Sequence, residues 1–370
     1  MGAALADTPT TVRCRHIFNH DIMGCTADGV AGNHLYSGRA LAATEPGDLI
    51  QLHPDLRPQW PAIRAHYQRI GLSHTDEVRW DLRHDLLAQH AGHEVSVFFF
   101  GPAEHAARPD DAWLRVVRTI NSKNAFMAEA ARLGVPVPRT QPFAAVARIS
   151  DKDIAAAPYP CYLKAAVSVS GIGIYRCEDE HQLREAITTF DPATPVQIQQ
   201  EVIAETFLNM QYEAGAAGLS RLAATEQVLD GFVHQGNRHP ARCEPWDVVE
   251  PMAQWLAQEG MRGVFAFDVA VLDGPEPYLA IECNPRYNGA SYPTAAARKL
   301  GIRHWLARTF MTRHRDLAAL DLDGLEYDCT TGEGVILINW GPILVGKLLV
   351  LLAGDAAVQQ RLARELSARL

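Results

Sequence analysis

Two apolar stretches near position 275 carry polar side chains that could do chemistry. Asp268 lies in the stretch 264–272, and Glu282 and Asn284 lie at the end of the stretch that begins at Tyr278. An Asp-Gly-Pro segment joins the stretches, and because this composition is typical of a tight turn, they are predicted to form a hairpin. Residues two apart on a strand point to the same face, so Glu282 and Asn284 should aim at one point, with Asp268 arriving from the other strand.

Oxygen atoms that converge in this way suit Mg²⁺, which binds carboxylate and amide oxygens and takes phosphate oxygens and water as further ligands. The alternative interpretation is that Asp268 and Glu282 are exposed strand charges and that Asn284 merely begins a turn. Their neighbours on both strands are apolar, however, and a carboxylate buried without a partner is costly. The sequence therefore favours a metal site formed by Asp268, Glu282 and Asn284.

The residues after this hairpin extend the same pattern. Arg286 is two residues beyond Asn284, so it should leave the strand on the metal-facing side, where a guanidinium could bind a phosphoryl or carboxylate group through two hydrogen bonds. The segment Tyr287–Ser291 is rich in turn-forming residues, and its backbone N–H groups are candidates for binding an anion. The residues expected to contact substrate here are Arg286, Asn288, Gly289 and Ser291.

Two lysines have the settings expected of phosphate ligands. Lys123 begins a predicted helix over 123–133, where a solvated lysine is the simpler interpretation. Lys164 lies in the apolar stretch 162–166, immediately before a loop of small residues whose N–H groups could fold over phosphates. The loop residues expected to bind phosphate are Ser168, Ser170, Gly171 and Gly173.

In combination, these residues resemble the ATP-grasp superfamily. Its members carry an acidic residue on one strand and a Glu-x-Asn pair, usually followed by Arg, on the next, and Asp268, Glu282, Asn284 and Arg286 match this pattern. The resemblance implies two Mg²⁺ ions, with Mn²⁺ as an acceptable substitute; Glu282 would bridge both ions, and Asp268 and Asn284 would each bind one. Arg286 would act catalytically by stabilising the transferring phosphoryl group or the later oxyanion.

The resemblance also implies roles outside the hairpin. Two lysines contact ATP phosphates in this superfamily, and Lys123 and Lys164 match them in order and spacing, with Lys164 also counted as catalytic. The segment 199–203 matches the strand that holds adenine, and ribose and substrate contacts are expected further along. The residues with these roles are Glu201, Val202 and Ile203 for adenine, Glu205 for ribose, and Arg238 and His239 for substrate.

The element pattern predicts a mixed fold with α/β and α+β parts. Residues 1–119 alternate short strands with helical patterns and are interpreted as an N-terminal parallel α/β (pre-ATP-grasp) domain. Residues 120–195 are assigned to the small lid subdomain of an ATP-grasp fold, and residues 196–370 to its C-terminal subdomain with the metal site. Two α+β subdomains are thus expected to follow the first domain.

Two local expectations complete the prediction. The spacing of leucines predicts a helix over Glu77–His90, and the C-terminal region predicts a strand over Val335–Asn339 followed by a helix from Leu344 onward. A membrane span over 335–353 is the alternative for the second region. It is disfavoured because the region contains Lys347, and charged residues inside spans are costly.

Composition and net charge limit the classes of partner that the chain is expected to bind. The chain has 370 residues, a formal net charge of -9 and no basic stripe, so no nucleic-acid partner is expected. Seven cysteines without a CxxC pair, in a chain with no secretory signal, favour reduced thiols and a cytoplasmic location. No membrane partner is expected, and a homodimer stays open.

The function implied by the resemblance is that of an ADP-forming ligase that makes C–N bonds. ATP would activate a carboxylate, from an amino acid or related small acid, as an acyl phosphate, and an amine would then displace phosphate to give an amide or peptide bond. The segment Tyr287–Pro293 resembles that of amino-acid and peptide ligases in the superfamily. The alternatives are a thioester ligase, a carboxylase, a carboxylate kinase and a non-catalytic nucleotide-binding module.

Overall fold

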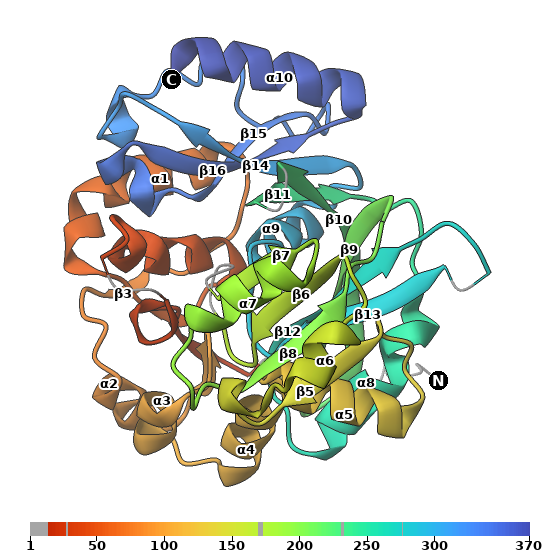
Figure 1. Ribbon diagram of the computed structural model, residues 1–370. Coiled ribbons are helices and arrows are strands. Elements are labelled where there is room, and N and C mark those ends of the chain that lie inside the picture. The colour runs from red at the N-terminus through yellow and green to blue at the C-terminus, as the bar shows by residue number, and fades with distance from the viewer. Residues whose placement is uncertain (1–13, 27–28, 169–172, 231–232, 276) are drawn as a thin grey trace, which may run out of the picture.

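A computed structural model of the protein describes residues 14–26, 29–168, 173–230, 233–275 and 277–370. The described residues form three sheets: a four-stranded parallel sheet near the N-terminus, a four-stranded antiparallel sheet, and an eight-stranded antiparallel sheet. The small sheet and its helices lie in front of the large sheet in Figure 1, and the C-terminal helix lies at the top. The mixed α/β and α+β architecture agrees with the predicted fold class.

The N-terminal sheet has the strand order β3-β2-β1-β4, and all its pairs are parallel. Short helices connect the strands, as expected for a parallel layer. The strands are β1 (His16–Asn19), β2 (Leu49–Gln51), β3 (Glu77–Arg79) and β4 (Glu94–Val97). The helices are η1 (Met23–Cys25), η2 (Asn33–Ala43), η3 (Pro54–Gln59), α1 (Trp60–Arg69), α2 (Asp85–Gln89), α3 (Pro102–Ala107) and α4 (Asp111–Ile120).

The predicted helix over Glu77–His90 is wrong for most of its length. Residues Glu77–Arg79 form β3, which pairs with β2 in parallel register, and only Asp85–Gln89 is helical. The leucine spacing that indicated a helix is local, whereas the pairing of Glu77 with Leu49 depends on a strand 28 positions earlier. Tertiary pairing overrides the local preference here.

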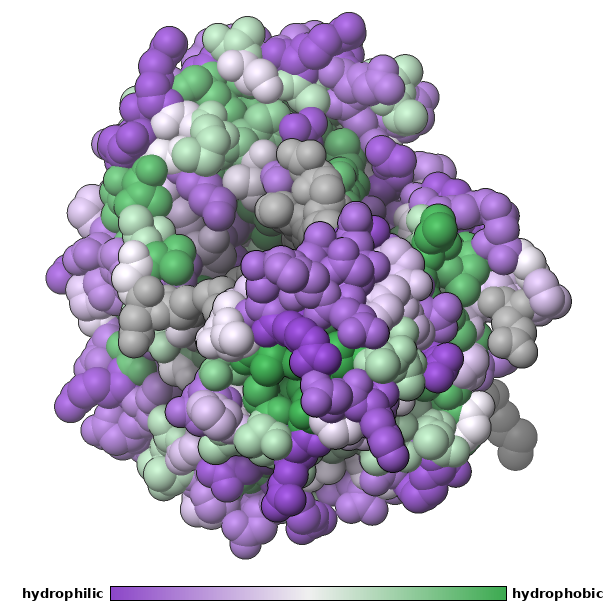
Figure 2. Space-filling view, in the orientation of Figure 1, coloured by the Kyte–Doolittle hydropathy of each residue, from purple (hydrophilic) through white to green (hydrophobic). Residues whose placement is uncertain are grey.

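The small antiparallel sheet has the order β5-β8-β6-β7, and α6 and α7 pack beside it. The surface over α7 is hydrophilic in Figure 2, so this helix faces water on one side and the small sheet on the other. Its strand β8 begins at Val196, so the sheet continues past residue 195. The elements are β5 (Thr140–Phe143), η4 (Val146–Arg148), α6 (Asp151–Ala155), β6 (Cys161–Ala165), β7 (Ile174–Cys177), α7 (Glu180–Thr188) and β8 (Val196–Gln200).

The large sheet has the order β13-β12-β9-β10-β11-β14-β16-β15. One face packs on α4, α5 and α8 through a cluster that includes Phe126, Leu256 and Phe267. The predicted helix over 123–133 is confirmed as α5, and the predicted hairpin is confirmed as β12 and β13. The elements up to the hairpin are α5 (Lys123–Leu133), β9 (Thr206–Gly215), β10 (Gly218–Asp230), β11 (Val233–His239), α8 (Trp246–Gln258), β12 (Gly263–Val271) and β13 (Tyr278–Asn284).

The C-terminal strands extend the large sheet. The predicted helix from Leu344 is wrong, because Lys347–Ala353 is a strand that pairs with both of its neighbours. A fully buried apolar run lacks the periodicity that separates strand from helix, so the sequence pattern did not distinguish them. The elements are α9 (Ser291–Leu300), β14 (Trp305–Met311), η5 (Leu317–Ala319), β15 (Gly334–Asn339), η6 (Gly341–Val345), β16 (Lys347–Ala353) and α10 (Ala356–Arg369).

Among the described helices, none has the length and apolar character that crossing a membrane requires. The apolar region 335–353 consists instead of two antiparallel strands joined by η6.

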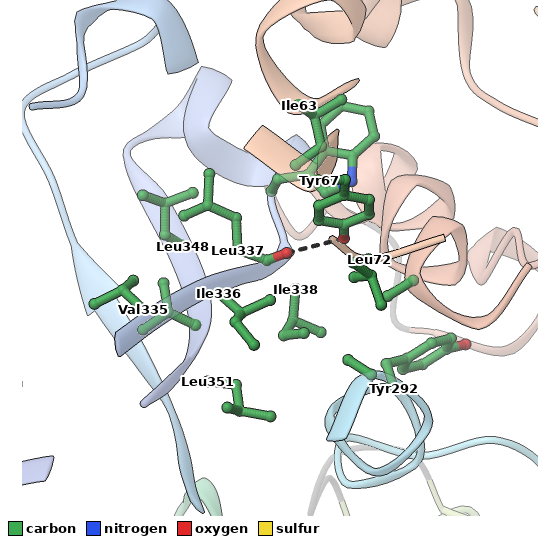
Figure 3. Packing of buried hydrophobic residues seen from close by; sticks show 14 of the residues in the cluster. Ile63, Tyr67, Leu72, Tyr292, Val335, Ile336, Leu337, Ile338, Leu348 and Leu351 are labelled. Carbon is green, nitrogen blue, oxygen red and sulfur yellow. Dashed lines mark hydrogen bonds between the residues drawn. The ribbon is translucent and has the colours of Figure 1, made fainter. Parts of the chain in front are cut away.

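The N-terminal part packs closely on the C-terminal strands. Figure 3 shows the hydroxyl of Tyr67 donating a hydrogen bond to the carbonyl oxygen of Leu337, at 2.9 Å, within a large apolar cluster. A Cβ atom at Gly341 would lie 2.2 Å from the carbonyl oxygen of Leu35, so only glycine allows this approach of η6 to η2. The N–H of Tyr287 donates to the carbonyl oxygen of Phe98 at 3.2 Å, so the segment that follows β13 also contacts the residue that follows β4.

Candidate functional site

The two hairpin carboxylates face each other across the strands. Asp268 on β12 pairs directly with Glu282 on β13, and an irregularity in the register follows at once. Asn209 on β9 and Gln227 on β10 donate hydrogen bonds of 2.8 and 2.9 Å to one oxygen of Asp268. Burial and the neighbouring Glu282 raise the pKa of Asp268 to about 7, although these hydrogen bonds favour its charged form. The hairpin therefore holds an acid whose negative charge is only partly compensated.

Asn284 and Arg286 continue the same face. The amide nitrogen of Asn284 donates to the other oxygen of Asp268 at 3.2 Å, and Nη1 of Arg286 donates to the amide oxygen of Asn284. The structure thus brings together Asp268, Glu282, Asn284 and Arg286, as strand alternation predicted. These oxygen and nitrogen atoms occupy one small region at the end of the hairpin.

Lys123 reaches this region from α5. Ser122 caps the helix by accepting a hydrogen bond from the backbone N–H of Ala125, which fixes where the helix begins. The Nζ atom of Lys123 lies 3.0 Å from Oε2 of Glu282 and 3.1 Å from the hydroxyl of Ser168. Lys123 is therefore a buried residue of the site and not a solvated helix lysine.

The lysines also determine the charge of Glu282. Burial alone would raise the pKa of Glu282, but Lys123, Lys164 and Arg286 outweigh burial and hold it below the ordinary value. Glu282 is therefore ionised at neutral pH, and its pKa is shifted in the opposite direction from that of the neighbouring Asp268. A cavity between α5 and the hairpin is lined by Lys123, Ser168, Glu282, Asn284 and Arg286, among others.

Lys164 lies on β6 of the small sheet. Its Nζ atom donates to the side-chain oxygen of Gln199 on β8 at 2.6 Å. Burial lowers the pKa of Lys164 to about 8, an effect that Glu282 opposes and Lys123 reinforces. A lysine with this pKa is mostly charged at neutral pH. Its hydrogen-bond partner Gln199 is neutral, so Lys164 can also bind an anionic ligand.

The loop after β6 is described only in part. Ser170 and Gly171 lie outside the described residues, whereas Ser168 contacts Lys123 as stated above. Gly173 has φ of +74°, and its carbonyl oxygen accepts a hydrogen bond from the N–H of Ala165 at 2.8 Å. Gly173 therefore closes the base of the loop in a conformation that favours glycine.

The proposed adenine segment lies at the end of β8. The carboxylate of Glu201 binds Nε of Arg176 at 2.7 Å and the hydroxyl of Tyr162 at 3.0 Å, so its oxygens are already engaged. Ile203 is 91% exposed, and Val202 is half-buried, which leaves the backbone of this segment at the surface. Glu205 is exposed and lies 3.4 Å from Arg242.

The turn after β13 is held by its own side chains. The N–H of Asn288 donates to the hydroxyl of Ser291 at 3.0 Å, and the N–H of Ala290 donates to the side-chain oxygen of Asn288 at 2.9 Å. These two N–H groups are therefore engaged within the turn, and the binding of an anion or substrate by the segment Tyr287–Ser291 stays a prediction. The amide nitrogen of Asn288 donates to Asn209 at 3.2 Å, so the turn contacts the same residue as Asp268.

Arg238 does not lie on the sheet face that carries these residues, and a substrate role for His239 stays a prediction. Arg238 is exposed and lies opposite Glu226 on the neighbouring strand. The residue before Glu226, Thr225, lies opposite Asn209 and so shares the sheet face of Asn209. Side chains alternate along a strand, so Arg238 lies on the other face of the sheet from Asp268. The ring of His239 stacks on Trp305 at 5.7 Å.

Sequence reasoning missed several residues that support the site. Asn209, Gln227 and Gln199 each hydrogen-bond a candidate residue, and Asn209 and Gln199 lie on strands whose other face packs in an apolar cluster. The available signal was the alternation of amides with apolar residues, as in Gln197-Ile198-Gln199. Amides spaced by two on a buried strand need partners, which indicates a polar site on that face.

Known proteins share this architecture at low sequence identity. No family model matches the chain, and no curated protein matches its sequence. Phosphoribosylamine–glycine ligase from Thermotoga maritima has 14% identity over 96% of this chain and 97% of that chain, with a TM-score of 0.59. N5-carboxyaminoimidazole ribonucleotide synthetase, solved as an ADP complex, has 14% identity over 95% of both chains, with a TM-score of 0.58.

The chain has the ATP-grasp fold. The synthetase from Thermus thermophilus supports the same conclusion, with 14% identity over 96% of this chain and 98% of that chain and a TM-score of 0.57. The coverage shows that the N-terminal sheet, the small sheet and the large sheet are all part of the shared ATP-grasp architecture. At this identity the likeness concerns the fold, and the function has to be argued from the residues of the site.

Proposed function

We propose that the protein is an ATP-dependent ligase that activates a small carboxylic acid as an acyl phosphate and joins it to an amine. The observation that carries this proposal is the convergence of two carboxylates, one amide and three cations on one region. Asp268, Glu282 and Asn284 come from the hairpin with Arg286, and the lysines come from two other elements. Phosphoryl transfer needs this combination, because catalysis depends on positioning and on neutralising charge.

The donor set fits divalent metal ions. Asp268 and Glu282 lie opposite each other, and burial together with the neighbouring Glu282 carboxylate raises the pKa of Asp268. Asn284 adds a third oxygen, and hard oxygen ligands of this kind suit two Mg²⁺ ions, or Mn²⁺ in their place. When bound, such ions neutralise phosphate charge and orient the phosphoryl group for transfer.

The cations of the chain would bind the nucleotide phosphates. Lys123 and Lys164 both lower the pKa of Glu282, and the loop that contains Ser168, Ser170 and Gly171 would cover the phosphates and exclude water. The backbone of Glu201–Ile203 would hold adenine, since the Glu201 carboxylate is engaged with Arg176, and Glu205 would bind ribose. One structural neighbour was solved as an ADP complex, which supports the proposal that this chain binds an adenine nucleotide.

The reaction would proceed in two steps. A carboxylate oxygen of the acid attacks the γ-phosphorus of ATP, the bond to the β–γ bridging oxygen breaks, and ADP leaves. The nitrogen of the amine then attacks the acyl carbon, loses a proton, and expels phosphate. Arg286 would stabilise the transferring phosphoryl group and then the oxyanion, because its planar fork contacts two oxygens at once. The name of one structural neighbour, phosphoribosylamine–glycine ligase, likewise pairs an amine with an amino acid.

A screen for ADP release tests the proposal. Carboxylic acids are supplied with ATP and Mg²⁺, with and without a panel of amines, and hydroxylamine is added to trap the acyl phosphate as a hydroxamate. We expect ADP release that depends on one class of acid, with hydroxamate formed in equal amount when no amine is present. Efficient coupling without hydroxamate, and without transfer of ¹⁸O from the carboxylate to phosphate, would falsify the acyl-phosphate route.

A further inference from the structure

Arg39 is an unusual charged residue outside the hairpin. It lies in η2 with only 7% of its surface exposed, and no ion pair to it is found in the part of the chain that the structure describes. Its guanidinium carbon lies 4.5 Å from the ring centres of both Phe98 and Tyr292, and 5.1 Å from that of Tyr36. Cation–π contacts stabilise the faces of the guanidinium, but its N–H donors lie in the plane and need oxygen acceptors.

Two of these donors lack an acceptor. Nε and Nη2 of Arg39 are shielded from water, and neither has a hydrogen-bond partner among the described residues. A buried donor without a partner is costly, and the cost is greater when the group is charged. A ligand that carries oxygen atoms would remove this cost.

The same edge of the guanidinium binds a carboxylate elsewhere in this chain. Arg69 donates through Nε and Nη2 to the two oxygens of Glu326, each at 2.7 Å. Arg176 donates through the same pair of nitrogens to the two oxygens of Glu201, at 2.7 and 2.9 Å. This fork matches two oxygens of a carboxylate or a phosphate. In Arg39 the same two nitrogens, Nε and Nη2, have no hydrogen-bond partner among the described residues.

This fork lies next to the turn that follows the catalytic hairpin. Phe98 contacts both cations, since its ring centre is 4.5 Å from the guanidinium carbon of Arg39 and 5.9 Å from that of Arg286. Tyr292, which also contacts Arg39, lies in the first turn of α9 and shares a hydrogen bond of 2.8 Å with the buried His20. Two guanidiniums therefore flank one ring, and within the described ranges no carboxylate is paired with Arg39.

We propose that Arg39 binds a second anionic group of the substrate whose carboxylate is activated beside Arg286. The substrate class is then a small acid with two anionic groups, either a dicarboxylate, such as an acidic amino acid, or a phosphorylated acid. The assignment of this anion to the substrate rests on the proposed ligase function, whereas the anion site at Arg39 does not.

Binding titrations test the anion site without turnover. Inorganic phosphate, acetate, malonate and succinate are titrated calorimetrically into the full chain, its Arg39→Gln and Arg39→Lys variants, and an Arg64→Gln control. Arg64 is an exposed arginine paired with Asp76, so its removal should leave anion binding unchanged. Circular dichroism and melting temperature show that each protein is folded.

We expect phosphate or a dicarboxylate to bind the wild type and the control equally, and to bind Arg39→Gln about tenfold to a hundredfold more weakly. Arg39→Lys keeps the charge but lacks the fork, so it should also bind more weakly. Preference for phosphate indicates a phosphorylated acid, and preference for malonate or succinate indicates a dicarboxylate. The anion site is wrong if no probe binds the wild type, or if folded Arg39 variants bind every probe as tightly as the wild type does.

Turnover then tests the assignment to substrate. The acid that triggers ADP release should carry two anionic groups, and Arg39→Gln should raise its KM about tenfold or more while the KM for ATP stays unchanged. A monocarboxylate that reacts with the same KM in the wild type and in Arg39→Gln would overturn the assignment. If no acid releases ADP, the ligase function fails, and the titrations still decide the anion site.

Discussion

Two partly buried acids in this protein have pKa values shifted in opposite directions. Glu326 accepts hydrogen bonds from His66 at 2.7 Å and from two nitrogens of Arg69, and these partners outweigh burial and hold its pKa at about 2. Asp268 lies opposite a second carboxylate, and burial with that neighbour raises its pKa to about 7.

The difference lies in the source of the compensating charge. Glu326 obtains its partners from the chain, and the other ring nitrogen of His66 accepts the N–H of Leu337 at 3.1 Å, so the network joins α1 to β15. Asp268 obtains amide hydrogen bonds but forms no direct ion pair with any of the described residues. A compensated buried acid stabilises the fold, whereas an incompletely compensated one is available to a ligand.

The largest expected effect comes from removing the hairpin charge. Glu282→Gln should lower ADP formation by about 10²–10³-fold or more, because electrostatic stabilisation at the reacting phosphate is lost. The amide keeps an oxygen for Lys123 and removes repulsion from Asp268, so the melting temperature should not fall. A coupled-enzyme assay measures ADP formation, and thermal unfolding measures the melting temperature. The Glu129→Gln variant, which alters a surface ion pair, is the control. Turnover like that of the wild type would refute a metal site at Glu282.

Arg286→Lys should reduce turnover by a comparable factor, about 10²–10³-fold. Lysine offers a point charge in place of a fork, but Lys123 and Lys164 remain, so ATP affinity should change little. Rate assays and calorimetric ATP titration separate the two effects, and Arg298→Lys on the exposed side of α9 is the control. A loss of ATP affinity equal to the loss of rate would place Arg286 in nucleotide binding instead.

The other half of the comparison is tested by Glu326→Gln. This change should lower the free energy of unfolding by about 1.5–3 kcal/mol at pH 7, the usual range for hydrogen bonds to charged groups. The ordinary pKa of this carboxyl is 4.5 and the folded value is about 2, so its contribution is present above pH 4.5 and is lost as the pH falls toward 2. Urea unfolding at pH 7 and pH 3 should show a smaller difference from wild type at pH 3.

Asp76→Asn, which alters an exposed ion pair, should show little difference from wild type at pH 7 and serves as control. A difference for Glu326→Gln that is equal at both pH values would mean that the carboxylate charge does not stabilise the contact between α1 and β15.

The smallest expected effect concerns the charge of Lys164. Its pKa of about 8 means that the free protein loses this positive charge as the pH rises through 8, so ATP affinity should decline between pH 7 and 9.5. Lys164→Arg should remove this decline, since arginine stays charged. Lys164→Ala should weaken ATP binding about tenfold at pH 7, and Lys123→Ala should weaken it less. Calorimetric ATP titration across this pH range measures the affinities. If the ATP affinity of Lys164→Arg declines as much as that of the wild type, another group is responsible for the pH dependence.

The sequence by itself determined the features that depend on near neighbours. The Asp-Gly-Pro turn and two-residue alternation placed Asp268, Glu282 and Asn284 on one face. The helix predicted over 123–133 is α5, which Ser122 caps at its start and Gly134 follows at its end. These patterns work because a strand repeats every two residues and a helix ends where its backbone donors and acceptors are capped.

Tertiary structure alone decided which distant residues complete the charge pattern. Asn209 and Gln227 meet Asp268 only because β9 pairs with β12 and β10 pairs with β9 in that register. The aromatic rings that contact Arg39 likewise come from separate elements of the chain. Cross-strand register put Arg238 on the opposite face, and pairing with β14 and β15 made the apolar run at 347–353 a strand. Pairing across a sheet depends on contacts between segments far apart in the chain, which local periodicity does not encode.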